Sequence, residues 1–161
     1  MTSKIGIHSI RPNKVLSFVG QAKLKGVIFP VVKAVDDTGT AIEVKKVSPN
    51  TITITRFVTA DDGMQGLQNW TQTDRINFAK KQLDYLFFRC KDQFGVDHPE
   101  IRANTNYFEI VNEADPRGFY DFYGLALIEL VKEANARGVK LALPAFNAGN
   151  WLGAAQESEE E

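Results

Sequence analysis

The stretch that decides the fold is Tyr107-Phe-Glu-Ile-Val-Asn-Glu-Ala-Asp-Pro116. Its first half, Tyr107–Val111, is rich in aromatic and β-branched residues and predicts a strand. Its second half ends in Asp115-Pro116, residue types that favour the N-cap and first turn of a helix. Apolar residues then recur at helical spacing over Phe119–Ala134, and Gly138 is suited to end that helix. The stretch therefore predicts a strand that leads directly into a helix.

The same alternation of strand and helix runs through the rest of the chain. Amphipathic segments begin near Pro12, Thr40 and Asp74, and each predicts a helix. Short apolar runs predict four further strands, at Ile5–His8, Val27–Val35, Thr51–Thr55 and Val139–Phe146. Such alternation is typical of an α/β fold with parallel strands joined by right-handed crossovers.

Two architectures fit this order of elements. One is a complete five-stranded doubly wound sheet of the flavodoxin-like kind. The other is the first part of a (β/α)₈ barrel, whose full length is about 250 residues. We expect the second: a partial TIM barrel of about five parallel strands and four helices over residues 1–149, followed by an acidic C-terminal tail at 150–161.

Composition excludes several classes of protein. The 19 Lys and Arg against 20 Asp and Glu give a net charge of -1, so a general nucleic-acid footprint is not expected. No apolar run is long enough to span a membrane. The single cysteine, Cys90, excludes an intrachain disulfide and lies on an apolar helix stripe, where we expect it in the core. The N-terminal sequence lacks a signal peptide, so a cytoplasmic location is expected, although a mature secreted fragment would look the same.

Polar residues follow the predicted strands, and they are the candidates for a binding site. In both architectures ligands meet the carboxyl ends of the strands. The candidates at these ends, in chain order, are His8, Lys33, Arg56, Asn112, Glu113 and Asn147. Together they predict a polar rim with charges of both signs.

The Asn112-Glu113 pair carries a resemblance to a known family. An Asn-Glu pair at the end of a fourth strand, after an aromatic-rich strand and before a proline, resembles the acid/base motif of clan A glycoside hydrolases, which are retaining (β/α)₈ enzymes. The family pattern is commonly Asn-Glu-Pro, whereas here the proline is Pro116, two places later. Ile5–His8 resembles a first barrel strand and Val139–Phe146 a fifth, so the resemblance covers roughly residues 4–150.

The resemblance implies roles for particular residues. Glu113 corresponds to the proton donor and Asn112 to the residue that hydrogen-bonds the sugar 2-hydroxyl. Retaining chemistry needs a second carboxylate about 5–5.5 Å away as nucleophile. In the family this carboxylate comes from a seventh strand, which this sequence does not contain. We therefore expect a carbohydrate-binding, glycosidase-like domain that is catalytically incomplete as a single chain and uses no cofactor or metal. We expect its remaining rim residues to contact the sugar, with His8 as either a sugar contact or a core histidine. Trp70 in the long loop either stacks on a sugar ring or packs under the loop.

Other interpretations stay open from the sequence alone. Glu113 can instead cap the helix that follows it. The chain can be a non-catalytic half-barrel that serves assembly, or a flavodoxin-like domain that binds a small anion at its helix N-termini. A half-barrel leaves one apolar layer uncovered, which predicts a homo-oligomer formed through that open face. The residues expected on the open face are Ile5, Ile7, Val32, Ile54, Ile110 and Leu143, or their neighbours in the strands.

Overall fold

The computed structural model describes residues 7–9, 12–57, 66–92, 94–111 and 119–143. The chain divides into two compact units. Unit 1 comprises Met1–Val58 and Leu86–Ile110, and unit 2 comprises Thr59–Tyr85 and Val111–Glu161.

Unit 1 contains the sheet and the helices that connect its strands. The elements within it, in chain order, are β1 (Ile7–Ser9), α1 (Pro12–Leu24), β2 (Val31–Val35), α2 (Gly39–Val47), β3 (Ile52–Arg56), the end of α3 (Gln72–Arg89), α4 (Pro99–Asn104) and β4 (Tyr107–Glu109). Unit 2 holds the 3-10 helix η1 (Leu67–Asn69), most of α3, and α5 (Tyr120–Ala136).

The sheet is parallel, and its strands follow one another in chain order. β1 pairs with β2, β2 with β3 and β3 with β4, so the order is β1-β2-β3-β4. The prediction of an α/β fold with parallel strands is confirmed. The sequential order differs from that of a flavodoxin-like sheet, in which the first strand lies between the second and the third.

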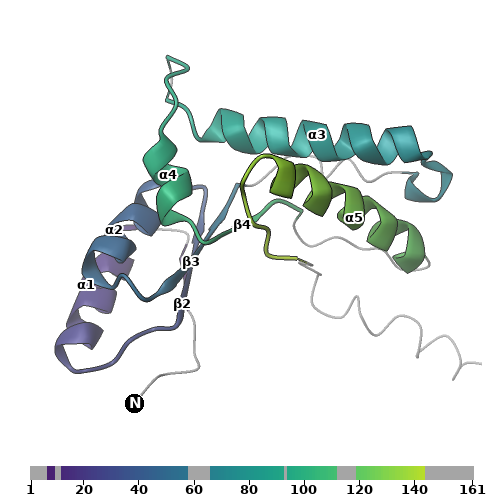
Figure 1. Ribbon diagram of the computed structural model, residues 1–161. Helices are drawn as coiled ribbons and strands as arrows, with labels where there is room; N and C mark the ends of the chain where they lie inside the picture. The colour runs from purple at the N-terminus through teal and green to yellow at the C-terminus, as the bar shows by residue number, and fades with distance from the viewer. Residues whose placement is uncertain (1–6, 10–11, 58–65, 93, 112–118, 144–161) are drawn as a thin grey trace, which may run out of the picture. The chain divides into compact units, whose positions relative to one another are not determined.

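The helices of unit 1 form one layer on one face of the sheet. α1 packs against α2, and α2 packs against both α4 and the strands β2 and β3 (Figure 1). The core of this layer joins Val15 and Val19 of α1 to Val32 of β2 and Val44 of α2. Consecutive crossover helices that share a face are typical of a singly wound sheet, because a doubly wound sheet distributes its helices over both faces.

Side-chain alternation then assigns the opposite face of the sheet, which we call the helix-free face because α1, α2 and α4 all lie on the other side. Val32 faces the helices and is paired with Thr53, so the alternate residues Lys33 and Ile54 face the other way. Ile52 and Tyr107 occupy the same helix-free face and are exposed. The expectation for Ile54 agrees with this assignment. Ile7 and Val32 do not lie on this face, because both pack into the core with residues of α1 and α2, so in these strands the expectation holds only for their neighbours. Ile5 lies outside the described residues.

Two further elements differ from the sequence predictions. α4 was not predicted, although Pro99 and Glu100 in its first turn are typical of a helix start. The fifth strand was expected at Val139–Phe146. Within the described part of that segment, residues 139–143, Leu141 occupies a single β-bridge position and no strand is formed, and residues 144–146 lie outside the described residues.

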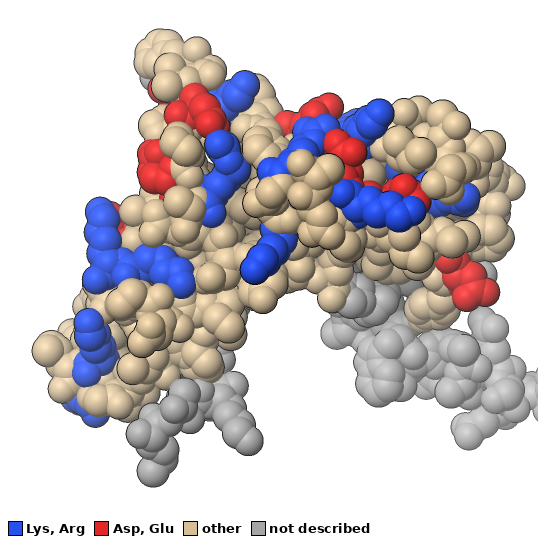
Figure 2. All heavy atoms as spheres, viewed as in Figure 1, with Lys and Arg blue, Asp and Glu red and all other residues tan. Residues whose placement is uncertain are grey.

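Unit 2 is a helical pair. Leu83 of α3 and Leu130 of α5 are fully buried, and Arg137 after α5 contacts Asp84 of α3 at 2.6 Å. Figure 2 shows basic and acidic side chains side by side over these helices. No helix among the described residues is both long and apolar enough to cross a membrane.

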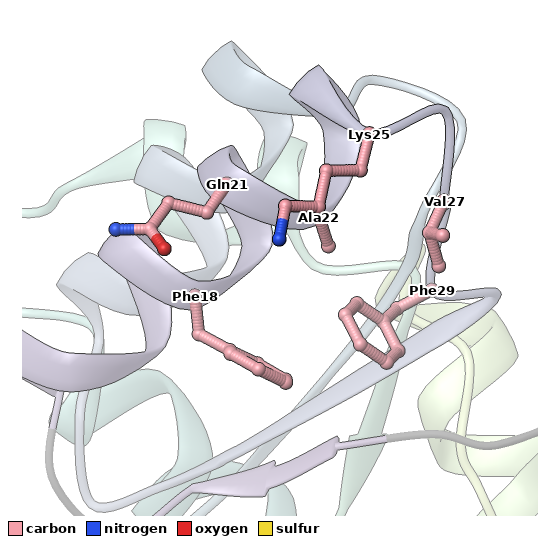
Figure 3. Close-up of a pocket in the computed structure, with 6 residues that line it drawn as sticks. All are labelled: Phe18, Gln21, Ala22, Lys25, Val27 and Phe29. Atoms are coloured by element: carbon pink, nitrogen blue, oxygen red, sulfur yellow. The ribbon is translucent and has the colours of Figure 1, made fainter.

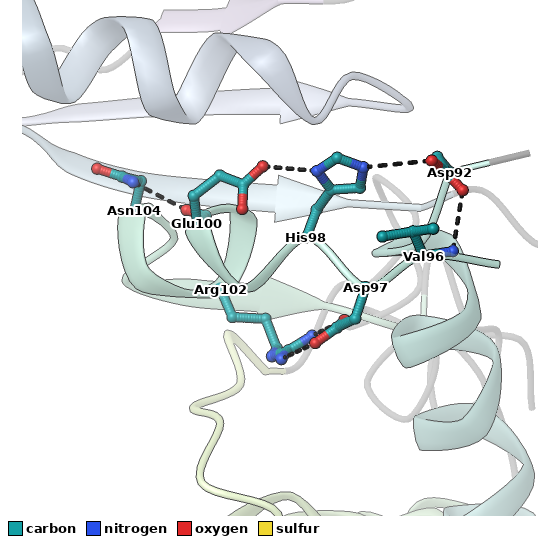
Figure 4. Close-up of polar contacts among 7 residues, drawn as sticks. All are labelled: Asp92, Val96, Asp97, His98, Glu100, Arg102 and Asn104. Carbon is teal, nitrogen blue, oxygen red and sulfur yellow. Dashed lines mark hydrogen bonds and ion pairs between the residues drawn. The ribbon is translucent and has the colours of Figure 1, made fainter. Parts of the chain in front are cut away.

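The segment between α3 and α4 is held together by polar contacts around His98 (Figure 4). The ring Nδ1 of His98 lies 2.6 Å from Glu100, and its Nε2 lies 3.8 Å from Asp92. Asp92 in turn accepts backbone N–H groups of Phe94 and Val96. The hydrogen bond to Glu100, followed by the nearby charges, raises the pKa of His98 above its ordinary value of 6.5.

We expect this arrangement to make stability depend on pH. A raised pKa means that the folded chain favours protonated His98, so the stabilisation is complete below about pH 6.5 and is lost as the pH rises through the folded-state pKa. Urea unfolding on both sides of that range should show the free energy of unfolding falling with pH, and less steeply in His98→Gln. An identical pH dependence in the two proteins would contradict the assignment.

Cys90 lies in the core, as predicted. Its side chain is fully buried, and burial raises the pKa of the thiol. A buried thiol with a raised pKa is a poor nucleophile, which fits a structural role.

Candidate functional site

Three charged side chains come together on the helix-free face near the carboxyl ends of the strands. Arg56 and Glu109 are the last residues of β3 and β4, and they are directly paired across these strands. Lys33 lies in β2, paired with Ile54, two residues before Arg56. The pleat directs all three side chains to the same face. We call this group the Lys33–Glu109–Arg56 cluster.

The two cations contact Glu109 unequally. The Lys33 Nζ lies 2.6 Å from each carboxylate oxygen of Glu109. The Arg56 Nη1 lies 3.8 Å from the nearer oxygen, which is beyond hydrogen-bond distance. The exposed fractions of the side chains are 21% for Lys33, 8% for Glu109 and 11% for Arg56. The cluster is therefore largely shielded from water, and its electrostatic interactions are stronger than those of surface pairs.

Arg56 has unused hydrogen-bonding capacity. Its Nε is buried and has no hydrogen-bond partner among the described residues. A guanidinium carries five N–H donors in a fixed planar fork. The cluster thus presents a donor-rich group beside a carboxylate that Lys33 already holds.

A second ion pair lies at the same edge of the sheet. Asp36 directly follows β2, and its N–H donates to the Arg56 carbonyl at 2.8 Å. Asp36 adopts a φ of 53°, an uncommon conformation for a residue other than glycine. The Arg89 Nη2 contacts the Asp36 carboxylate at 3.1 Å, and the Arg89 guanidinium lies 4.9 Å from the ring centre of Phe57. These contacts fix the chain where it leaves β2.

Asp37 serves the helix that follows it. Its carboxylate accepts the N–H of Gly39 at 2.9 Å and also bonds the Thr40 hydroxyl. This is capping of the first turn of α2. Asp37 therefore has a structural role in the turn between β2 and α2. No group of three or more potential metal ligands occurs among the described residues.

The structure brings together some of the predicted rim residues. Lys33 and Arg56 share one cluster, and His8 is paired with Lys33 in the sheet register. Trp70 lies in unit 2, where its ring is 5.1 Å from that of Phe78. The remaining predicted site residues, Asn112, Glu113 and Asn147, lie outside the described residues.

Sequence reasoning missed Glu109. The available signal was a single charged residue inside an otherwise apolar strand, Tyr107–Val111. A charge is rarely buried unless it is paired, so an acid at that position indicates a basic partner on a neighbouring strand.

A surface hollow of about 270 Å³ lies at the opposite end of β2, away from the cluster (Figure 3). The residues that line it come from α1 and from the segment leading into β2, and they are Phe18, Gln21, Ala22, Lys25, Val27 and Phe29. The rings of Phe18 and Phe29 lie 5.3 Å apart on its wall. Its lining is mainly apolar and is not at the strand ends where ligands of this fold class bind.

Comparisons with known proteins give no assignment. No family model matches the chain, no curated protein matches it, and no solved structure matches it.

Proposed function

We propose that this chain is a glycoside hydrolase-like (β/α) barrel domain whose strand-end rim binds a carbohydrate. The observation that carries the proposal is the Lys33–Glu109–Arg56 cluster. Its members come from three consecutive parallel strands, with Lys33 in the middle of β2 and Arg56 and Glu109 at the carboxyl ends of β3 and β4. Glu109 comes three residues before Asn112. Ligand-binding side chains of barrel enzymes come from the ends of several different strands in this way.

The arrangement of strands and helices supports the same proposal. A (β/α) barrel has sequential parallel strands with its helices outside and side chains filling the inner face. The order β1-β2-β3-β4 and the single helix layer of unit 1 match that pattern. The helix-free face of the sheet then corresponds to the inside of a barrel. Its charged cluster corresponds to the floor of the binding site.

The chemistry assigns different tasks to these residues. Lys33 and Arg56 supply donors to sugar oxygens, and Glu109 holds Lys33 in place. Under this proposal Asn112 bonds the 2-hydroxyl and Glu113 is the proton donor. The resemblance identifies no residue of this chain that corresponds to the second carboxylate of retaining glycosidases. Under this proposal the chain therefore binds sugar but hydrolyses it slowly or not at all.

Glycan binding is the direct test. The intact chain should bind at least one member of a panel of neutral and acidic glycosides in an NMR titration. Asn112→Ala should weaken that binding about tenfold, because one hydrogen bond to the ligand is lost. Asn77→Ala, at an exposed position of α3, is the matched control and should bind as the unaltered chain does. Failure to bind any glycan would contradict the proposal.

Hydrolysis is the second readout of the same proposal. Aryl glycosides should be cleaved at or near the background rate by the isolated chain, since a single carboxylate does not complete the retaining mechanism. Turnover that disappears in Glu113→Gln would show that the chain is a complete glycosidase, and another carboxylate would then be the nucleophile.

The second candidate function is assembly of half-barrels. It is favoured by the exposed apolar side chains Ile52 and Tyr107 on the helix-free face. A two-fold pair of identical chains would cover that face. Light scattering separates this candidate from a monomeric sugar-binding domain, for which the mass is 18.0 kDa.

A further inference from the structure

The Lys33–Glu109–Arg56 cluster has one more positive than negative charge. Both oxygens of Glu109 are engaged by Lys33 at 2.6 Å. Arg56 is left at 3.8 Å, where the attraction to Glu109 is present but no hydrogen bond is formed.

Burial makes the imbalance costly. The Arg56 side chain is 11% exposed, and its Nε is buried without a partner among the described residues. A charge shielded from water is unfavourable unless an opposite charge and hydrogen bonds replace its hydration. A bound anion would supply both, and the Arg56 side chain keeps 11% of its surface exposed.

The shape and charge of the cluster favour one class of anion. The planar fork of an arginine matches the two oxygens of a carboxylate. A carboxylate with a single negative charge balances the one excess positive charge of the cluster, whereas a phosphate of about −1.5 to −2 charges would leave excess negative charge beside Glu109. A neutral hydroxyl would satisfy a donor without balancing the charge.

We infer that the rim selects an acidic sugar, a uronic acid whose carboxylate binds Arg56 and whose ring lies against the strand ends. The inference rests on the proposed function, since it names the class of sugar that the rim takes. Lys33, held by its hydrogen bond to Glu109, lies in β2 beside the strand that carries Arg56 and adds to the positive potential there.

The test compares sugars that differ only at carbon 6. Each sugar is titrated into the intact chain and followed by NMR. One pair is methyl glucuronide and methyl glucoside, and the other is methyl galacturonide and methyl galactoside. In at least one pair the uronide should bind about tenfold more tightly, and added salt should reduce the difference. Inorganic phosphate is titrated as a separate arm.

Variants assign the preference to Arg56. Arg56→Gln should abolish the preference for the uronide, and Arg56→Lys should leave part of it, because the charge remains but the fork is lost. Lys46→Met removes the same unit of charge from an exposed position of α2 and should leave the preference unchanged. The salt dependence of the unaltered chain tests the inference even if an Arg56 variant fails to fold.

The outcomes separate this inference from the proposed function. Equal binding of the uronide and its neutral partner would overturn the inference and leave the carbohydrate site in place. Binding of phosphate with no binding of any sugar would overturn both. A uronide preference that survives Arg56→Gln would overturn the assignment to Arg56.

Discussion

Replacing Glu109 by alanine is expected to lower the free energy of unfolding by about 3 kcal/mol. The substitution leaves Lys33 and Arg56 facing each other at a largely shielded position with no carboxylate between them. Removing one partner of a buried ion pair is costly because the remaining charge stays desolvated. The expected value is at the lower end of the costs typical of breaking a buried ion pair, since Lys33 is 21% exposed and can turn toward water. Urea unfolding followed by circular dichroism measures the change.

An exposed ion pair in the same unit provides the matched control. Glu43 and Lys46 of α2 also lie 2.6 Å apart, but their side chains are 44% and 66% exposed. Glu43→Ala should therefore cost no more than about 0.5 kcal/mol. The two substitutions remove the same group at the same ion-pair distance, so the difference between their costs in unfolding free energy reports the effect of burial. Equal costs would mean that Glu109 is hydrated in solution.

A double variant distinguishes the cost of an orphaned charge from loss of packing. Lys33→Met combined with Glu109→Leu removes the Lys33–Glu109 ion pair, keeps similar volumes and leaves Arg56 as the one remaining charge of the cluster. It should be more stable than Glu109→Ala alone, because buried pairs are often replaced by apolar residues with little loss. If the double variant is less stable than the single variant, the effect of Glu109 is packing and not charge.

The sequence predicted the class of fold because strand and helix patterns are local. β-branched residues at Thr51–Thr55 and the helical spacing of apolar residues in Asp74–Phe94 require no knowledge of neighbours. The order of the strands is not local, and both barrel and doubly wound alternatives remained open until the pairing β1-β2-β3-β4 was known. α4 is only six residues long, too short for a periodic pattern to stand out.

The candidate site could be predicted only in part, for a related reason. Lys33 and Arg56 were placed on one rim because parallel strands end at a common edge. Which face they occupy depends on the phase of the pleat, and the nearly continuous apolar run Val27–Val35 contains no alternation that reveals it. Val32 was assigned to the open face for that reason, although it packs under the helices. The pairing of Glu109 with Lys33 joins residues 76 positions apart and depends on the sheet register.

The second large effect is expected at Phe108, the residue of β4 that faces the helix layer. Phe108 is 1% exposed, and its ring stacks on that of Phe57 at 6.4 Å between centres. Phe108→Ala should lower the free energy of unfolding by about 4 kcal/mol, since burial of the ring is lost and a cavity remains. Urea unfolding is again the measurement.

Phe88→Ala is the control for Phe108→Ala, because it removes the same ring from a position that is 67% exposed and should change stability by less than about 0.5 kcal/mol. The comparison also tests the assignment of faces on which the site depends. Phe108 and Glu109 are neighbours in β4, so if Phe108 packs under the helices then Glu109 must point to the helix-free face. A cost for Phe108→Ala no larger than that for Phe88→Ala would mean that Phe108 is not in the helix-side core. The placement of Glu109 beside Lys33 and Arg56 would then fail with it.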